Sequence, residues 1–219
     1  MITTIEDPVE HQMAGIGQVE VNVKAGLTFA RGLRTILRSD PDVLLVGEIR
    51  DEETAKIAVQ AALTGHLILS TLHAHNAAAS IARLRDMGVE PSLLATAVNC
   101  IIAQRLARRL CLTCRQPVQA TPEELAELGF ARDDADVTLY RARGCHDCAQ
   151  TGYKGRVALY EVMPMEGEVR RRVEASTEEI FEAAVADGMK TLRDDGHRHA
   201  LAGITSLDEV RRVTGDRLF

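Results

Sequence analysis

The stretch DPDVLLVGEIRDEET, residues 40–54, carries the clearest structural signal in the chain. Its run Val43–Val46 is continuously apolar, which is typical of a central strand in a parallel sheet that is buried on both faces. The run ends at Gly47, and Glu48 and Arg50 follow at once. Because ligands of open α/β sheets bind beyond the carboxyl ends of the strands, this stretch predicts both a buried strand and a candidate chemical site.

Apolar runs and helical patterns alternate around this stretch. Strands that alternate with helices predict an α/β fold with a mostly parallel sheet, covered by helices on both faces. We expect strands at Ile2–Ile5, Val19–Val23, Val43–Val46 and Leu67–Thr71, and helices at Phe29–Leu37 and Glu52–Leu63.

The pattern changes after Leu110, where an insert bounded by cysteines, Cys111–Cys148, begins. One strand is then expected at Val157–Val162. Ser176 and Ser206 each precede a glutamate by three residues, which predicts capping boxes. The sequence thus predicts a sheet core at 1–110, a tetracysteine module at 111–155 and a helical subdomain at 156–219. The helices expected in the last part are Glu166–Val173, Thr177–Val185, Leu192–Leu201 and Leu207–Val213.

The composition is that of an ordinary globular chain, with 219 residues and 46% hydrophobic content. A formal net charge of -6 argues against broad electrostatic binding of nucleic acid, which requires a concentrated cationic surface. We find no run of roughly 18 apolar residues and no basic segment followed by an apolar one at the N-terminus. We therefore expect a cytoplasmic protein that contacts membranes only through partners, without inserting into them.

Carboxylates follow two of the expected strands. Glu48 lies just beyond Val43–Val46, where it could orient an attacking water or hold Mg²⁺ through water in phosphoryl transfer. Glu6 and Asp7 follow the first strand in the same way, before a turn at Pro8. Any one of these acids could instead be a helix cap or a solvated loop residue. Two acidic clusters at equivalent strand ends favour the chemical interpretation.

Three arginines share one face of the expected helix Phe29–Leu37, since Arg31, Arg34 and Arg38 recur at intervals of three and four residues. Guanidinium groups in a row can bind phosphate oxygens or reach across a subunit boundary. The alternative is an ordinary solvated helix face. Arg50 lies close to Glu48 in the sequence, which favours the phosphate-binding interpretation.

Histidines flank the expected strand in TGHLILSTLHAHNA, residues 64–77. His66 precedes the strand and His73 follows it, where polar side chains could respond to a terminal phosphate. The alternative is that both histidines cap the strand and bind backbone groups. His73 and His75 could also form a metal pair, but no third ligand is evident nearby.

Four cysteines form two C-x-x-C pairs, Cys111 with Cys114 and Cys145 with Cys148, with 30 residues between the pairs. Four thiolates in two pairs suit tetrahedral, structural Zn²⁺. Four unrelated thiols would seldom give this spacing. His146 is a weaker fifth candidate, and we expect the remaining Cys100 to be packed in the core.

No P-loop is present in these residues. The motif G-x-x-x-x-G-K-[ST] places a lysine after a glycine, because backbone N–H groups cradle the phosphates and the lysine neutralises them. The four lysines of this chain all follow other residues: Lys24, Lys56, Lys154 and Lys190.

In this order, the motifs resemble those of the type II secretion and type IV pilus assembly ATPase family. ITTIEDPVE resembles the Asp box of that family, residues 27–54 resemble its arginine helix and atypical Walker B segment, and residues 64–77 resemble its His box. The resemblance continues through AQRLARRLC and the paired cysteines to TLRDDGHRHALAGITSLDEVRRVT. It implies an incomplete RecA-like P-loop ATPase core.

The resemblance also implies roles for single residues. Glu48 would be the catalytic Walker B glutamate, after the Gly47 that this family commonly has there. The Asp-box acids would be Glu6, Asp7 and Glu10, and the His-box residues would be His66 and His73. Positions associated with nucleotide sensing and subunit contacts correspond to Arg34, Arg38, Arg50 and Arg83.

The family is one of motors that use ATP and Mg²⁺ to drive pilin or pseudopilin assembly at the inner membrane. The resemblance therefore implies a hexameric ring, platform proteins of the inner membrane as partners, and peripheral association with that membrane. A tetracysteine module is shared by secretion and pilus-extension motors and is generally absent from retraction motors, which favours extension or secretion.

The P-loop and the N-terminal domain of the family precede the Asp box. We therefore expect Met1 to be an internal methionine taken as a start, and the chain not to hydrolyse ATP by itself. The alternative is a non-catalytic assembly module, stapled by zinc, that docks with intact subunits or with the membrane platform.

Overall fold

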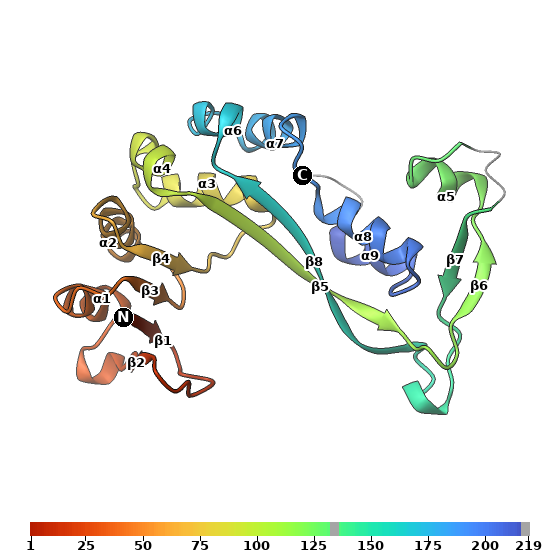
Figure 1. The fold of residues 1–219 in the computed structure, drawn as a ribbon, viewed down its shortest axis with the longest axis horizontal. Helices are drawn as coiled ribbons and strands as arrows, with labels where there is room; N and C mark the ends of the chain where they lie inside the picture. The colour runs from red at the N-terminus through yellow and green to blue at the C-terminus, as the bar shows by residue number, and fades with distance from the viewer. Residues whose placement is uncertain (132–135, 216–219) are drawn as a thin grey trace. The chain divides into compact units, whose positions relative to one another are not determined.

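The computed structural model describes residues 1–131 and 136–215, and the chain divides into two compact units (Figure 1). The first unit contains Met1–Ile101 and Met163–Asp187, and the second contains Ile102–Val162 and Gly188–Phe219. Each unit is therefore formed by two separate segments of the chain. The division at residues 110 and 155 stays a prediction.

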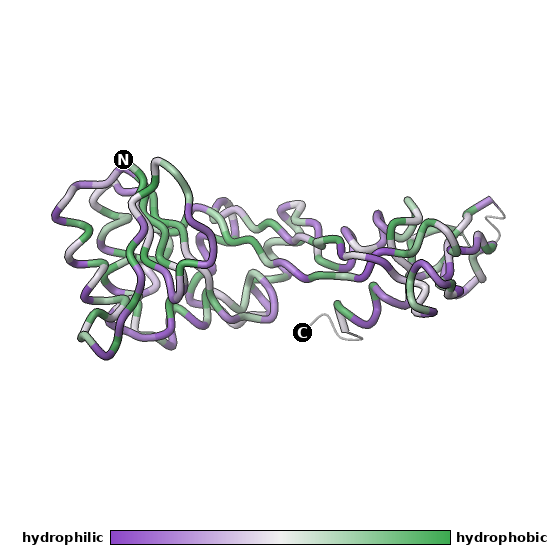
Figure 2. The backbone as a smooth tube through the Cα atoms, turned by 90° about the horizontal axis from the view of Figure 1, so that it is seen from below, coloured by the Kyte–Doolittle hydropathy of each residue, from purple (hydrophilic) through white to green (hydrophobic). Residues whose placement is uncertain are grey.

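The first unit is built on four parallel strands in the order β2-β1-β3-β4. Their bounds are β1 Ile2–Glu6, β2 Gly17–Glu20, β3 Val43–Val46 and β4 Leu67–Ser70. The first unit contains apolar segments, green in Figure 2, and among the four strands the apolar residues concentrate in β3 and β4. As the apolar run predicts, β3 is an inner strand, and its Leu44 and Val46 are fully buried. The predicted parallel α/β sheet is confirmed.

Two helices cover one face of this sheet. Thr28 caps α1, Phe29–Leu37, and Asp51 caps α2, Glu52–Leu63; a short 3-10 helix, η1 Val23–Ala25, precedes α1. The helices pack against each other, α1 against β1 and α2 against β4. A Cβ at Gly32 would lie 2.1 Å from Ile5 Cδ1, so only glycine lets α1 approach β1 this closely.

The opposite face of the sheet is more open. Leu67 and Leu69 of β4 are 50% and 47% exposed, so the predicted cover on both faces is found on one face in the described residues. The strand order explains this difference. The β2–β3 and β3–β4 connections advance in the same direction, so right-handed crossovers put α1 and α2 on the same face. The β1–β2 connection, residues 7–16, runs the other way and contains no helix.

Helices complete the first unit. Asn76 caps α3, and Arg85 on that helix donates to the carbonyls of Val173 and Ala175 at 3.2 and 2.7 Å, tying α3 to the turn before α7. The capping box predicted at Ser176 is present. The sequence patterns did not predict α3 or α4. The bounds are α3 Ala77–Asp86, α4 Pro91–Ala97, α6 Gly167–Arg171 and α7 Thr177–Ala186.

A ribbon of two strands, β5 Cys100–Leu110 and β8 Tyr153–Pro164, supplies much of the second unit. Ala107 and Leu159 on one side of the ribbon are fully buried with Leu192. Strand β8 is longer than predicted, and β5 is not predicted at all. Cys100 is exposed at the start of β5, so the prediction that it packs in the core is wrong; the alternation of the strand turns it outward.

The remainder of the second unit comprises a small hairpin and helices. The hairpin strands pair antiparallel, and one helix, α5, lies between them in the cysteine-bounded insert. Ser206 caps α9, but Glu209 does not return the bond, because its carboxylate binds Arg108 and Arg212. The box predicted there is therefore only half formed. The bounds are β6 Gln116–Gln119, α5 Pro122–Glu127, β7 Thr138–Arg141, η2 His146–Cys148, α8 Leu192–Leu201 and α9 Leu207–Thr214.

The described helices include none that is long and apolar enough to cross a membrane.

Candidate functional site

The turn after β3 is held between its two neighbouring strands. Gly47 N donates to Ile5 O at 2.8 Å, and Thr71 Oγ1 donates to Gly47 O at 2.7 Å. Ile49 N donates to Thr71 O at 3.1 Å. A Cβ at Gly47 would lie 3.2 Å from Ile5 O, which is tight for any side chain. The backbone on both sides of Glu48 is thus fixed at the carboxyl edge of the sheet.

Glu48 is the centre of a small charged cluster at this edge. Its Oε2 forms an ion pair with Arg50 Nε and lies 3.5 Å from His73 Nε2. The Glu48 side chain is 14% exposed, whereas that of Arg50 is 65% exposed. The hydrogen bond and charge of Glu48 raise the pKa of Arg50, and the charge of Asp7 adds to this effect. The structure therefore brings together a carboxylate, a guanidinium and an imidazole beyond β3.

The acids after β1 divide into two groups. Glu6 Oε1 accepts hydrogen bonds from Thr4 Oγ1 at 2.6 Å and Gln18 Nε2 at 3.0 Å, and these bonds lower the pKa of Glu6. Its carboxylate therefore lies between β1 and β2. Asp7 and Glu10 are exposed in the loop that follows β1.

His66 lies at the other edge of the sheet. It directly precedes β4, and the amino ends of parallel strands share one edge. Its Nδ1 is 3.1 Å from Ala61 O, and its Nε2 is 3.7 Å from Asp40 Oδ1. The structure therefore does not bring His66 near His73, and the contact of His66 with a backbone carbonyl agrees with the alternative of a strand-capping histidine.

The predicted arginine face of α1 is present. Arg31, Arg34 and Arg38 are exposed, while Leu33 and Ile36 on the same helix are buried. Arg34 Nη1 pairs with Glu53 Oε1 on α2 at 2.5 Å. Arg83 is exposed in the last turn of α3. No direct contact joins these arginines to Glu48 among the described ion pairs.

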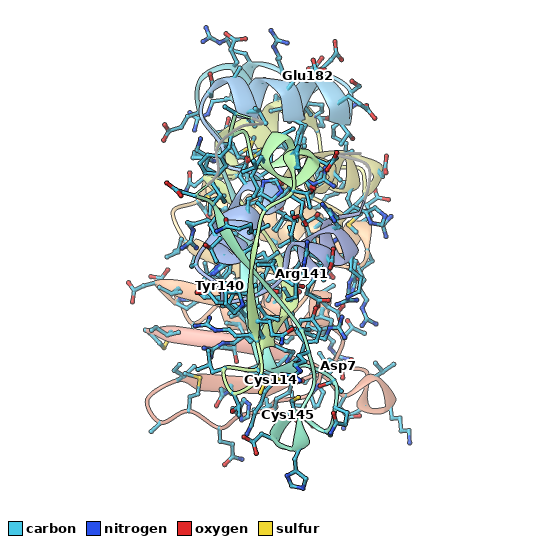
Figure 3. The ribbon with its side chains drawn as sticks, turned by 90° about the vertical axis from the view of Figure 1, so that its right-hand side faces the viewer. Asp7, Cys114, Tyr140, Arg141, Cys145 and Glu182 are labelled. Atoms are coloured by element: carbon cyan, nitrogen blue, oxygen red, sulfur yellow. The ribbon has the colours of Figure 1, made fainter. Side chains whose placement is uncertain are left out.

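The second unit holds the tetracysteine cluster. The sulfur atoms of Cys111, Cys114, Cys145 and Cys148 all lie within 4.8 Å of one another. Figure 3 labels one cysteine of each pair, Cys114 and Cys145, which lie close together. The described residues contain no other group of three or more histidine, cysteine or acidic side chains arranged to hold a metal, so His73, His75 and His146 belong to none.

The spacing of the sulfurs suits zinc. Three of the Sγ–Sγ distances are 3.9 Å for Cys111–Cys145, 3.8 Å for Cys114–Cys148 and 3.7 Å for Cys145–Cys148. A tetrahedral ion with Zn–S bonds of about 2.3 Å requires sulfurs about 3.8 Å apart. These three distances match a tetrahedral site, and four thiolate ligands would leave no position open for a substrate.

Backbone N–H groups stabilise the thiolate form of Cys148 in this cluster. Cys148 Sγ accepts hydrogen bonds from the backbone N–H groups of Cys145 at 3.2 Å and Gly152 at 3.1 Å. Burial opposes the thiolate of Cys148, but these donors outweigh it and lower the pKa of the thiol to about 6. A metal binds the thiolate form, so these donors favour the coordinating state of Cys148, whereas burial and the neighbouring sulfurs raise the pKa of Cys145 to about 12.

Comparison with known proteins identifies a family. The family model described as type II/IV secretion system protein matches residues 1–212. Type II secretion system protein E of Pseudomonas aeruginosa is 52% identical over 215 residues, which are 97% of this chain and 42% of that protein. The type IV pilus assembly ATPase PilB of Thermus thermophilus is 52% identical over 210 residues, 94% of this chain and 24% of that protein.

Two solved structures of motor proteins and ATPases have a similar fold. The pilus retraction motor PilT with bound ADP superimposes with a TM-score of 0.70 at 25% identity, covering 99% of this chain and 52% of that one. The ATPase DotB of Legionella pneumophila has the same fold, with a TM-score of 0.65. The chain spans less than half the length of the two secretion and pilus relatives. Because the family model matches residues 1–212, the chain belongs to the type II/IV secretion system protein family.

Proposed function

We propose that this chain forms the water-activating part of a secretion or pilus-assembly motor ATPase. The observation that carries the proposal is the position of Glu48. Its carboxylate lies beyond the inner strand β3, on backbone fixed by Gly47 and Thr71, with a guanidinium and an imidazole on the same oxygen. The carboxyl edge of an open α/β sheet is where such folds bind their ligands. The ATPase named among the relatives supports the same activity.

Each side chain then has a specific role. Glu48 would orient the attacking water and accept its proton, while Arg50 would contact the terminal phosphate. Asp7 and Glu10, exposed after β1, are carboxylates of the kind that hold Mg²⁺ through water, whereas Glu6 is engaged by Thr4 and Gln18 and would hold β1 and β2 together beside them. Mg²⁺ bound with ATP would neutralise charge that develops on the phosphates.

The remaining predicted residues would contribute less directly. Arg34, Arg38 and Arg83 lie on exposed helix surfaces, so they suit contacts with nucleotide held by a neighbouring subunit or with that subunit itself. His73 lies beside Glu48 and would help to orient its carboxylate. His66, at the opposite edge of the sheet, would support β4 rather than touch the phosphate.

We propose that the tetracysteine cluster binds structural Zn²⁺. The sulfur spacing of 3.7–3.9 Å and the N–H donors to Cys148 support this assignment. The metal would fix the two ends of the insert, Cys111 and Cys148, to each other. Such a module favours an extension or secretion motor over a retraction motor.

We propose that the working form is a hexameric ring on the cytoplasmic side of the inner membrane, bound to platform proteins and driving pilin or pseudopilin assembly. The proposal requires a phosphate-cradling loop, which these 219 residues do not contain. A chimera can supply it. In the Pseudomonas aeruginosa relative, this chain would replace the matching 42% of the protein.

The test is ATP hydrolysis by that chimera in the presence of Mg²⁺. We expect hydrolysis by the chimera, its loss by at least about 100-fold in the Glu48→Gln variant, and normal rates in the Glu52→Gln control. Glu52 is a suitable control because it is an exposed acid four residues away that pairs with Lys56. A folded oligomer in which Glu48→Gln hydrolyses ATP like the parent would refute the proposal.

A second candidate is a non-catalytic assembly module stapled by zinc. It is favoured by the preformed cluster, which lies in a different compact unit from Glu48. This alternative predicts that the chimera assembles and supports secretion equally well with Glu48→Gln, and that removal of zinc abolishes assembly. The same set of proteins therefore separates the two functions.

A further inference from the structure

The ion pair of Glu48 and Arg50 restricts how Glu48 can act in the proposed role. A carboxylate that orients water and accepts a proton must offer a free oxygen lone pair to that water. Here Oε2 is occupied by Arg50 Nε and also contacts His73 Nε2 at 3.5 Å. The arrangement therefore engages one of the two carboxylate oxygens of Glu48 with a cation.

The two partners differ in how freely they can move. Glu48 is mostly buried, and hydrogen bonds of Gly47 and Ile49 fix the backbone on either side of it. Arg50 has a long side chain that is 65% exposed, at the open edge of the sheet. A change of partner would therefore move Arg50 and leave Glu48 in place.

Phosphate is a competing partner for Arg50. Ion pairs with an exposed member contribute little to stability, because solvent screens them. Guanidinium groups bind phosphate oxygens through two parallel, charge-assisted hydrogen bonds, and a terminal phosphate carries more charge than one carboxylate. The high pKa of Arg50, raised by Glu48 and Asp7, keeps it charged throughout the exchange.

We propose that Arg50 is a positioning residue that pairs with Glu48 until a terminal phosphate arrives, then moves to the phosphate and releases the carboxylate for water. The inference rests on the proposed function, because it assumes that Glu48 activates water. It adds that the paired oxygen, Oε2, becomes available to water only when the phosphate to be cleaved is bound. Hydrolysis would thereby be coupled to occupancy of the site by a triphosphate.

The test uses NMR of the chimera described above, in which the relative supplies the phosphate-cradling loop, without turnover. The Arg50 Nε–Hε proton is expected to exchange slowly with water, to lose this protection in Glu48→Gln and to keep it in the Glu52→Gln control. Addition of Mg²⁺ and the non-hydrolysable analogue AMP-PNP is expected to shift the Arg50 signal. The Glu48 carboxylate carbon should move at the same time to the position that it has in Arg50→Ala.

Variants of Arg50 distinguish a positioning role of this residue from a purely structural role. Arg50→Ala should weaken AMP-PNP binding by about tenfold, since a charge-assisted contact is lost. Arg50→Lys should return the Glu48 carbon towards its wild-type position, because a cation remains. A purely structural role would give neither effect.

The outcomes distinguish this inference from the proposed function. If Glu48→Gln leaves the Arg50 signal unchanged, the pair does not exist and the inference is wrong. If AMP-PNP shifts Arg34 or Asp7 while Arg50 and Glu48 stay paired, the nucleotide site stands and the exchange is refuted. If no signal of the first unit moves although the chimera carries the phosphate-cradling loop, this unit offers no nucleotide site and both proposals are wrong.

Discussion

Replacement of Glu209 by glutamine is expected to destabilise the second unit strongly. The Glu209 side chain is fully buried. It accepts a hydrogen bond from the backbone N–H of Arg108 at 2.9 Å and others from the guanidinium groups of Arg108 and Arg212 at 2.6–3.0 Å. These contacts join β5 to α9 through one carboxylate.

The size of the effect follows from the pKa of this carboxyl. Burial alone would raise it, but the bonds from Arg212 and Arg108 outweigh burial and lower the pKa of Glu209 from 4.5 to about 2. A shift of that size corresponds to about 3 kcal/mol of folding free energy. Glutamine keeps the shape and one acceptor, and the two arginines can turn towards solvent, so we expect a loss of about 2–3 kcal/mol.

The pH dependence has a definite sign. Because the folded state lowers this pKa, the stabilisation is fully present above pH 4.5 and is lost as the pH falls from 4.5 towards about 2. The wild-type chain should therefore lose more stability than Glu209→Gln over this range. Loss of bound metal in acid affects both proteins equally and cancels in the difference.

Tyrosine provides a selective assay. The chain has no tryptophan, and its three tyrosines, Tyr140, Tyr153 and Tyr160, all lie in the second unit. Tyrosine circular dichroism during urea denaturation therefore reports on the unfolding of that unit. Asp208→Asn is the matched control, because Asp208 adjoins Glu209 on α9 but is 62% exposed, and it should change stability by less than about 1 kcal/mol. Equal effects of the two substitutions would refute the reasoning.

Two further predictions concern the cluster and the core. In zinc-loaded chain, a thiol reagent should modify Cys100 alone, because it is exposed while the other four thiols bind metal; Cys148→Ser should lose the metal and expose further thiols, as mass spectrometry would detect. More than one modified cysteine at full zinc occupancy would contradict a four-thiolate site. Gly32→Ala should cost about 1–3 kcal/mol in urea denaturation of the first unit, because the new methyl would overlap Ile5; an unchanged midpoint would show that α1 can move away from β1 without cost.

Local signals decided which elements were predictable. Strand β3 and helices α1 and α2 match their predicted bounds. An apolar run predicts the strand and an amphipathic pattern predicts the helices, and both signals lie within a short stretch of sequence. Strand β5 was missed because Arg105, Arg108 and Arg109 interrupt its apolar residues, and only a two-stranded ribbon with one open side tolerates them. Its stability comes from β8 and from Glu209, about 100 residues further along the chain.

The candidate site was predictable to a similar extent. Strand order in a parallel sheet puts residues that follow β1, β3 and β4 at one edge, so Asp7, Glu48 and His73 could be grouped from the sequence. The same rule separates His66, which precedes its strand. The pairing of Glu48 with Arg50 could not be predicted, because it depends on the side-chain conformations of two residues in one turn.

Glu48 and Glu209 are both paired with arginine, yet their surroundings give the pairs opposite properties. Glu209 is fully buried, with one backbone and two guanidinium donors, so breaking its contacts leaves a charge that water cannot reach. Glu48 meets a single guanidinium, on a side chain that is mostly exposed, so solvent or phosphate can replace that partner at little cost. Burial of the carboxylate and the number of its donors thus make the Glu209 contacts persistent and leave the Glu48 pair free to exchange. The difference predicts that Glu209→Gln alters the stability of the chain, whereas Arg50→Ala alters what its sheet edge binds.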